Sequence, residues 1–249
     1  MCKILFPMKN ISLSQKKLII LTTIMLIASW LSILGTFAKA ESAPYQKANN
    51  MDKKLIILGA SYAEGWDAKN LGSYIVINKG VGGQVTKQML DRMDEDVILL
   101  HPDAVILWGF INNIFRSPRD KMENTIEGIK NDYLLMIDMA HKNNIEPILA
   151  TEVTIRHKDT IKDSILNIVG YLLGKESYQD YINMNVTAVN DWIQDLAKKE
   201  KLRLLDIHAI TSTKDGVRKK GFATTDGSHI TKEAYKEITD YTTKKFNQR

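Results

Sequence analysis

The chain has 249 residues, of which 44% are hydrophobic and 25% are charged. This composition is ordinary for a globular protein, and the length is sufficient for a single domain to bury its own core. Five of the 34 basic residues lie in residues 1–40, which hold no acidic residue, so 29 basic and 29 acidic residues remain elsewhere. The basic pI therefore belongs to the N-terminus, and we expect no nucleic-acid partner.

Residues 1–40 have the three parts of an export signal. A basic segment without acids covers residues 1–17, an apolar run covers residues 18–37, and Ala38-Lys39-Ala40 follows as a small-residue cleavage site. We expect either a signal peptide cleaved after Ala40 or an uncleaved membrane anchor through residues 18–37, which are just long enough to span a bilayer. Either alternative exports the remaining chain, as a periplasmic or secreted protein. Residues 41–52 are polar and predict a linker.

Short apolar runs alternate with helical patterns from residue 53 onward. The runs that predict buried strands are residues 54–58, 74–78, 104–108, 146–153 and 202–207. Apolar spacings of three and four residues predict helices over residues 84–97, 122–140 and 182–196, and a last helix capped by Thr231. This alternation predicts an α/β domain over residues 53–249, with a five-stranded parallel sheet and helices on both faces.

Residues 156–180 are longer than a usual connection between a strand and a helix. Their apolar residues include Ile161, Ile165, Ile168 and Leu172, at helical spacing. The sequence leaves three alternatives open: a lid or acyl-chain wall over the site, a surface that touches a membrane, or an extra packed helix.

Glycine and polar residues gather where the predicted strands end. Ser61 follows the first strand, residues 80–83 follow the second, Asn112 follows the third, and Asp226 and His229 lie in a late loop. Ligands of parallel α/β sheets bind beyond the carboxyl ends of the strands. The sequence therefore predicts a functional site at this edge of the sheet.

The residue types at this edge suit nucleophilic catalysis. An alcohol such as Ser61 attacks poorly until a base such as His229 takes its proton, and Asp226 can fix the tautomer of that imidazole. A tetrahedral intermediate also needs hydrogen-bond donors, for which the backbone N–H groups of Ser61 and Gly83 and the side chain of Asn112 are suitable.

Other candidates have simpler interpretations. His208, beside Asp206 at the end of the fifth strand, is expected to be structural, and Arg218 with Lys219 and Lys220 is expected to form a solvated loop. No spacing of His, Cys and Asp predicts a zinc site. Residues 80–83 lack the Gly-Lys-Ser/Thr ending of a phosphate loop.

Over about residues 53–248 the chain resembles the SGNH hydrolases, the GDSL-like lipases and esterases. Four blocks carry the resemblance: Leu58-Gly59-Ala60-Ser61, Asn78-Lys79-Gly80-Val81-Gly82-Gly83, Trp108-Gly109-Phe110-Ile111-Asn112-Asn113 and Asp226-Gly227-Ser228-His229. The resemblance implies a flavodoxin-like, three-layer α/β/α sandwich. It also implies a triad of Ser61, His229 and Asp226, an oxyanion hole of Ser61, Gly83 and Asn112, and no metal or organic cofactor.

The activity implied by the resemblance is hydrolysis of an acyl ester or thioester through an acyl-serine intermediate. The implied substrates are O-acetylated carbohydrates or cell-envelope polymers, lysophospholipids and acyl thioesters. Two alternatives stay open, an acyltransferase with the same triad and an inactive binding module with the same fold. Ala60 and Asn113 depart from the family pattern, which has aspartate at both positions. Because both positions support the site and neither is the nucleophile or the base, we expect activity to survive.

Overall fold

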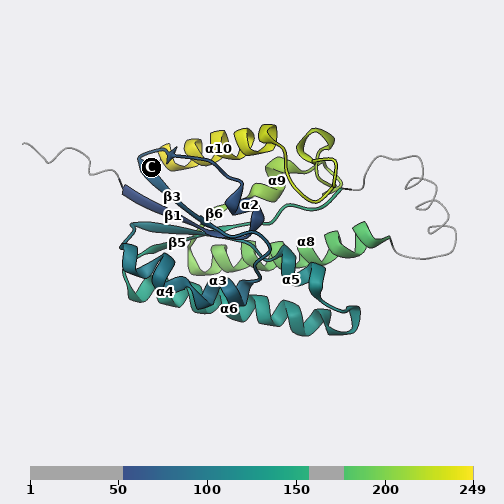
Figure 1. The fold of residues 1–249 in the computed structure, drawn as a ribbon, viewed down its shortest axis with the longest axis horizontal. Coiled ribbons are helices and arrows are strands. Elements are labelled where there is room, and N and C mark those ends of the chain that lie inside the picture. Colours follow the sequence, from purple (N-terminus) through teal and green to yellow (C-terminus); the bar gives the residue numbers. More distant parts are fainter. Residues whose placement is uncertain (1–52, 157–176, 249) are drawn as a thin grey trace, which may run out of the picture. The chain divides into compact units, whose positions relative to one another are not determined.

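The computed structural model describes residues 53–156 and 177–248, drawn in colour in Figure 1. The leader, the linker and most of the 156–180 segment lie outside the described residues, so export and the lid stay predictions. The end of that segment is described, because Ser177 caps the helix that begins at Tyr178. Within the described parts of the chain, no helix is both long and apolar enough to cross a membrane.

The predicted α/β architecture is confirmed. One sheet has the strand order β2-β3-β1-β4-β5-β6, and its strands are β1 (Lys53–Gly59), β2 (Asn70–Leu71), β3 (Tyr74–Gly80), β4 (Ala104–Trp108), β5 (Glu146–Ala150) and β6 (Arg203–Leu205). The five predicted strands are all present and pair in parallel. The four residues Leu55, Ile56, Ile57 and Leu58 of the central strand β1 are fully buried, and each stabilises the fold by about 1.5–3 kcal/mol.

The sixth strand, β2, was not predicted. It pairs antiparallel with β3 through Leu71 and Tyr74, across a two-residue turn that begins with Gly72 at φ +60°. Glycine tolerates this left-handed conformation, and a Gly-Ser pair between two short strands is a known hairpin signal. Gly72-Ser73 was therefore an available signal for the turn. The strand β2 itself has only two residues, too few to show an alternating pattern.

Helices cover both faces of the sheet (Figure 1). One face carries α9 (Ile207–Thr211) and α10 (Lys232–Asn247), and the other carries α3 (Thr86–Asp91), α6 (Met122–Lys142) and α8 (Tyr178–Glu200). The shorter helices are α2 (Ser61–Glu64), α4 (Met93–Asp96) and α5 (Ile111–Arg116), with 3-10 turns η1 (Ile98–Leu100), η2 (Arg119–Lys121) and η3 (Lys220–Phe222). The predicted cap is confirmed, since Thr231 Oγ1 accepts the N–H of Ala234.

The helix predicted over residues 84–97 is interrupted at Arg92, between α3 and α4. The Arg92 guanidinium donates to the carbonyl oxygen of Gly59 (3.0 Å) and to Gln84 Oε1 (2.7 Å). It also pairs with Asp96 at 2.6 Å. The arginine therefore ties this helical region to the carboxyl end of β1.

The strand predicted over residues 146–153 ends earlier, at Ala150. Beyond that point the chain pairs with side chains of α8 in place of a strand. Asn190 bonds both backbone groups of Glu152 (2.7 and 2.8 Å), and Asn183 bonds both backbone groups of Ile155 (2.8 and 3.0 Å). These two amides satisfy the backbone of an extended segment that would otherwise need another strand.

Candidate active site

The carboxyl ends of the three central strands lie level with one another. Gly59, the last residue of β1, pairs with Gly80 of β3 on one side and Trp108 of β4 on the other. Ser61, Gly83 and Asn112 follow these strand ends within a few residues. The register therefore brings three predicted site segments to one edge of the sheet, as the sequence predicts.

Ser61 is the first residue of the short helix α2, which begins directly after β1. This helix packs so closely on the neighbouring strand ends that glycine is required there. A Cβ at Gly80 would lie 2.0 Å from Glu64 N of α2, and one at Gly59 would lie 2.6 Å from Ala63 Cβ of α2 and 2.0 Å from the carbonyl oxygen of Trp108 in β4. The first N–H groups of a helix have no acceptor within it, so the position of Ser61 suits an oxyanion donor.

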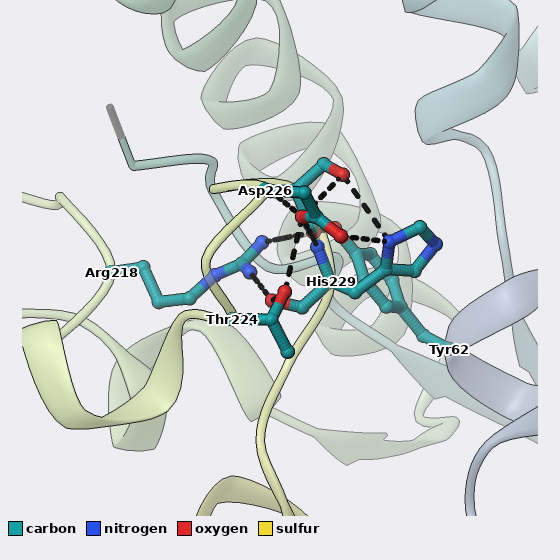
Figure 2. A network of polar contacts seen from close by, with 6 residues as sticks. Tyr62, Arg218, Thr224, Asp226 and His229 are labelled. Carbon is teal, nitrogen blue, oxygen red and sulfur yellow. Dashed lines mark hydrogen bonds and ion pairs between the residues drawn. The ribbon is translucent and has the colours of Figure 1, made fainter. Parts of the chain in front are cut away.

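Asp226 and His229 are in direct contact (Figure 2). Asp226 Oδ2 lies 2.8 Å from His229 Nδ1. Asp226 Oδ1 accepts hydrogen bonds from the N–H groups of Ser228 (2.6 Å) and His229 (2.8 Å). Gly227 has φ +77°, which allows this tight turn. One carboxylate oxygen thus shapes the turn while the other orients the imidazole.

This contact determines the tautomer of His229 and the ionisation of Asp226. A carboxylate only accepts hydrogen bonds, so Nδ1 carries a proton, and in the neutral ring Nε2 is left as the acceptor. Partial desolvation of Asp226 acts to raise its pKa, but hydrogen bonds from the backbone and ring of His229 and from Ser228 outweigh it and lower the pKa well below its usual value. Asp226 is therefore ionised at neutral pH, and Nε2 is the nitrogen available as a base.

Arg218 was expected in a solvated loop, and this prediction is wrong because its side chain is fully buried. Its Nη1 donates to the carbonyl oxygen of His229 (2.6 Å) and its Nη2 to that of Ser228 (3.0 Å). Nη2 also donates to the hydroxyl of Tyr62 (2.9 Å), the residue after Ser61. No apolar periodicity indicates this burial, because Arg218 lies in a loop beside two lysines.

The loop with Gly83 is held by α5. Asn112 Nδ2 donates one hydrogen to the carbonyl oxygen of Gln84 (2.9 Å), which leaves its second hydrogen for another acceptor. One turn later, Arg116 Nη2 donates to the carbonyl oxygen of Gly83 (2.6 Å). Gly83 has φ +77°, a conformation that favours glycine. The two predicted oxyanion donors beyond Ser61 are therefore neighbours.

Ala60 and Asn113, which depart from the family pattern, both have structural roles. Ala60 is 3% exposed and lies so close to Gly109 that a Cβ on that glycine would come within 3.2 Å of the Ala60 Cβ. Asn113 accepts the N–H of Thr86 (3.0 Å) and donates to its hydroxyl (3.0 Å). Asn113 thereby fixes the start of α3, directly after the Gly83 loop.

Glu152 is a buried acid that the sequence analysis missed. Its Oε2 accepts the N–H of Phe110 (2.8 Å) at the start of α5. Desolvation raises the pKa of Glu152 to about 7, against opposing backbone hydrogen bonds and the charge of Arg218. A glutamate inside the strand predicted over residues 146–153 was the available signal. Its carboxylate supports the N-terminus of the helix that carries Asn112.

Tyr62 of α2 connects the segment of Ser61 to the turn of Asp226–His229. Its ring centroid lies 6.4 Å from that of His229, and its hydroxyl donates to the carbonyl oxygen of Ser228 (2.5 Å). Among the hydrogen bonds between described residues, none joins Ser61 directly to His229. All five predicted site residues nevertheless lie on segments that meet at this edge.

His208 has the contacts of a structural residue. Its N–H donates to Thr151 Oγ1 (2.9 Å), and its Nε2 lies 3.2 Å from the carbonyl oxygen of Gly216. It forms no pair with Asp226, whose partner is His229. Within residues 53–156 and 177–248, no group of three or more His, Cys, Asp or Glu side chains is placed to hold a metal ion.

Known structures share this fold. A lipolytic protein of the G-D-S-L family from Desulfitobacterium hafniense is 20% identical with a TM-score of 0.60, over 77% of this chain and 98% of its own. A GDSL-like lipase from Bacteroides thetaiotaomicron is 21% identical with a TM-score of 0.59, over 86% and 97%. An acetylxylan esterase mutant from Geobacillus stearothermophilus is 15% identical with a TM-score of 0.59, over 79% and 95%.

A search of curated proteins finds no significant match to this chain. The sequence profile of the GDSL-like Lipase/Acylhydrolase family, in contrast, matches residues 58–237. The match spans the segments of Ser61, Gly83, Asn112, Asp226 and His229. The chain therefore belongs to the GDSL-like lipase/acylhydrolase family, and it is an ester hydrolase of the SGNH type.

Proposed function

We propose that this protein is an exported serine esterase in which Ser61, His229 and Asp226 form the catalytic triad. The observation that carries the proposal is the 2.8 Å contact between Asp226 Oδ2 and His229 Nδ1 at the edge where Ser61 lies. That contact leaves Nε2 as the proton acceptor. Ser61, the first residue of α2, is the nucleophile that the acceptor would activate.

In the acylation step, His229 Nε2 takes the hydroxyl proton of Ser61 as Oγ bonds to the ester carbonyl carbon. The carbonyl oxygen becomes an oxyanion, which the N–H groups of Ser61 and Gly83 and the remaining Asn112 hydrogen stabilise. The intermediate then collapses as its carbon–oxygen bond to the leaving alcohol breaks. His229 returns the proton to that alcohol, and the acyl group stays on Ser61.

In the deacylation step, a water molecule gives a proton to His229 Nε2 and attacks the acyl-serine. The same donors stabilise the second oxyanion, and the bond between the acyl carbon and Ser61 Oγ breaks. Ser61 regains its proton from His229, and a carboxylic acid leaves. If a sugar hydroxyl takes the place of water, the same steps give acyl transfer.

The substrate we propose is a short acyl ester of a hydrophilic alcohol, such as an O-acetylated carbohydrate. The side chains of His229 and Asp226 are 56% and 47% exposed. Among the described residues at the same edge of the sheet, Glu64 of α2, Val81 and Gly82 before Gly83, and Arg116 of α5 are exposed too, and two of the four are charged. A polar, open rim favours a hydrated leaving group over a long acyl chain, whose burial needs an apolar wall.

Hydrolysis of p-nitrophenyl acetate, butyrate and octanoate by the purified full-length chain, beside Ser61→Ala, tests this proposal. We expect Ser61-dependent release that is fastest with acetate. Unchanged release of p-nitrophenol by Ser61→Ala would show that Ser61 is not the nucleophile. A preference for octanoate would favour a lipid substrate. Acetate release from acetylated xylan, with added sugar acceptors, separates hydrolysis from transfer.

Export is proposed from the basic, apolar and small-residue parts of residues 1–40. The mass of the protein recovered from cell fractions tests it. A mature N-terminus at Glu41 outside the cytoplasm supports a cleaved signal peptide, whereas a full-length membrane-bound protein supports the anchor. Recovery of the full-length protein in the cytosol would contradict both.

A further inference from the structure

Arg218 carries a buried positive charge, and all its hydrogen-bond acceptors are neutral. Arg218 is 0% exposed, and among the described residues it forms no ion pair. Its partners are the carbonyl oxygens of Thr154, Ser228 and His229 and the hydroxyl of Tyr62. Burying a charge is costly unless hydrogen bonds compensate it, so a purely space-filling role would be met better by an apolar side chain.

The guanidinium fixes the backbone that carries the base. Nη1 and Nη2 bond the consecutive carbonyl oxygens of His229 (2.6 Å) and Ser228 (3.0 Å). Nε bonds the carbonyl oxygen of Thr154 (2.7 Å), beyond the carboxyl end of β5. The planar fork of arginine holds several acceptors in a fixed geometry, which the single ammonium of lysine does not reproduce.

The same guanidinium contacts Tyr62, the residue after Ser61 in α2. The Tyr62 hydroxyl accepts from Nη2 (2.9 Å) and donates to the carbonyl oxygen of Ser228 (2.5 Å). Figure 2 shows Arg218 and Tyr62 close to the pair of Asp226 and His229. Burial raises the pKa of Tyr62 to about 12, so the hydroxyl keeps the proton that it donates. Arg218, Tyr62 and Ser228 therefore form a closed set of contacts between α2 and the turn of Asp226–His229.

We infer that Arg218 is a positioning residue, which with Tyr62 sets the separation between Ser61 Oγ and His229 Nε2. This inference rests on the proposed triad. Asp226 fixes the rotation of the imidazole ring, but the place of the ring relative to Ser61 depends on where the backbone of residue 229 lies. Arg218 and Tyr62 link that backbone to the residue after the nucleophile.

The first test is Arg218→Lys, measured for kcat and KM on p-nitrophenyl acetate and for the rate of Ser61 modification by a fluorophosphonate. We expect kcat and the modification rate to fall together, about 10- to 100-fold, with KM within about twofold, because small misplacements of reacting groups have effects of this size. Arg203→Lys is the matched control. Arg203 is 14% exposed and pairs with Glu146 at 3.1 Å near the opposite, amino-terminal edge of the sheet, so kcat should not change.

The second test is Tyr62→Phe, which keeps the ring and removes only the hydroxyl, so the protein should fold even if Arg218→Lys does not. We expect kcat to fall about threefold to tenfold with KM unchanged, because the change removes the two hydrogen bonds of the hydroxyl, to Ser228 and from Arg218. Tyr241→Phe is its control. The Tyr241 hydroxyl accepts the N–H of Asp206 (3.1 Å), away from the base turn, so its loss should lower stability without lowering kcat.

A third readout needs no substrate. The proton between His229 Nδ1 and Asp226 gives a low-field ¹H NMR signal, which should shift or broaden in Arg218→Lys and Tyr62→Phe but not in the controls. Unchanged kcat, modification rate and signal in Tyr62→Phe would overturn the positioning role, whatever the stability of Arg218→Lys. A wrong assignment of the triad would give a different result, because turnover would then persist in Ser61→Ala.

Discussion

At the scale of single residues, Asp226 divides its two oxygens between the backbone turn and the imidazole. Asp226→Asn should preserve much of the turn, because an amide oxygen still accepts from Ser228 and His229. The amide would no longer favour a proton on Nδ1, so we expect kcat to fall about 10⁴-fold. Steady-state kinetics measures this.

Asp240→Asn is the control for this change, since Asp240 forms an exposed pair with Lys236 on α10. The kcat of Asp240→Asn should equal that of the unaltered protein. A drop of less than about tenfold in Asp226→Asn would show that Asp226 is not the orienting member of a triad.

Glu152 is a second single residue with a predicted effect, because it makes the stability of the fold depend on pH. Its folded pKa is about 7, above the ordinary value of 4.5, so the folded state binds the proton more tightly than the unfolded state. The stabilisation is complete below pH 4.5 and is lost as the pH rises toward 7, by up to about 3 kcal/mol. Urea unfolding at pH 5 and pH 7.5 measures the loss.

Glu152→Gln should remove this pH dependence while its amide oxygen still accepts the N–H of Phe110. Asp226 acts in the opposite sense. Because its pKa is lowered, its contribution is present above its ordinary pKa and is lost only as the pH falls below it. Persistence of the same decline between pH 5 and 7.5 in Glu152→Gln would assign it to another group.

At the scale of elements, the contact of α2 with the strand ends depends on two glycines. A Cβ at Gly59 would lie 2.0 Å from a backbone oxygen of β4, which cannot move without breaking the sheet. We expect Gly59→Ala to lower the free energy of unfolding by about 3 kcal/mol or more, and to lower kcat by displacing Ser61. Chemical denaturation and turnover measure the two effects.

Gly128→Ala is the matched comparison, because Gly128 lies in α6 and a Cβ there would meet nothing within 4 Å. Alanine is the better helix former, so this change should stabilise the protein by about 0.5–1 kcal/mol. Equal effects of the two substitutions would show that close packing of α2 is not what requires Gly59.

The elements also show how far the sequence could predict this fold. The five parallel strands and the helices α6, α8 and α10 follow from apolar periodicity, because their buried faces leave a regular pattern. The end of β5 at Ala150 could not be predicted. It depends on Asn183 and Asn190, two polar residues distant in sequence whose amides replace a strand partner.

At the scale of the whole molecule, the positions of Ser61, Gly83, Asn112, Asp226 and His229 were predictable, since each lies in a short local motif. What could not be predicted is the buried network beneath them. Arg218 approaches Tyr62 across 156 positions of sequence, and neither residue stands in an apolar pattern that would place it in the interior. Such contacts depend on tertiary structure rather than on local spacing.

The central claim is that Ser61 is the nucleophile activated by His229 and Asp226. Treatment of the full-length protein with a fluorophosphonate, followed by intact-mass and peptide-mass measurement, tests it most directly. We predict one adduct, located on Ser61, and none in Ser61→Ala, whose unfolding midpoint should stay close to that of the unaltered protein. An adduct on another residue, or equal labelling of Ser61→Ala, would show that Ser61 is not the nucleophile.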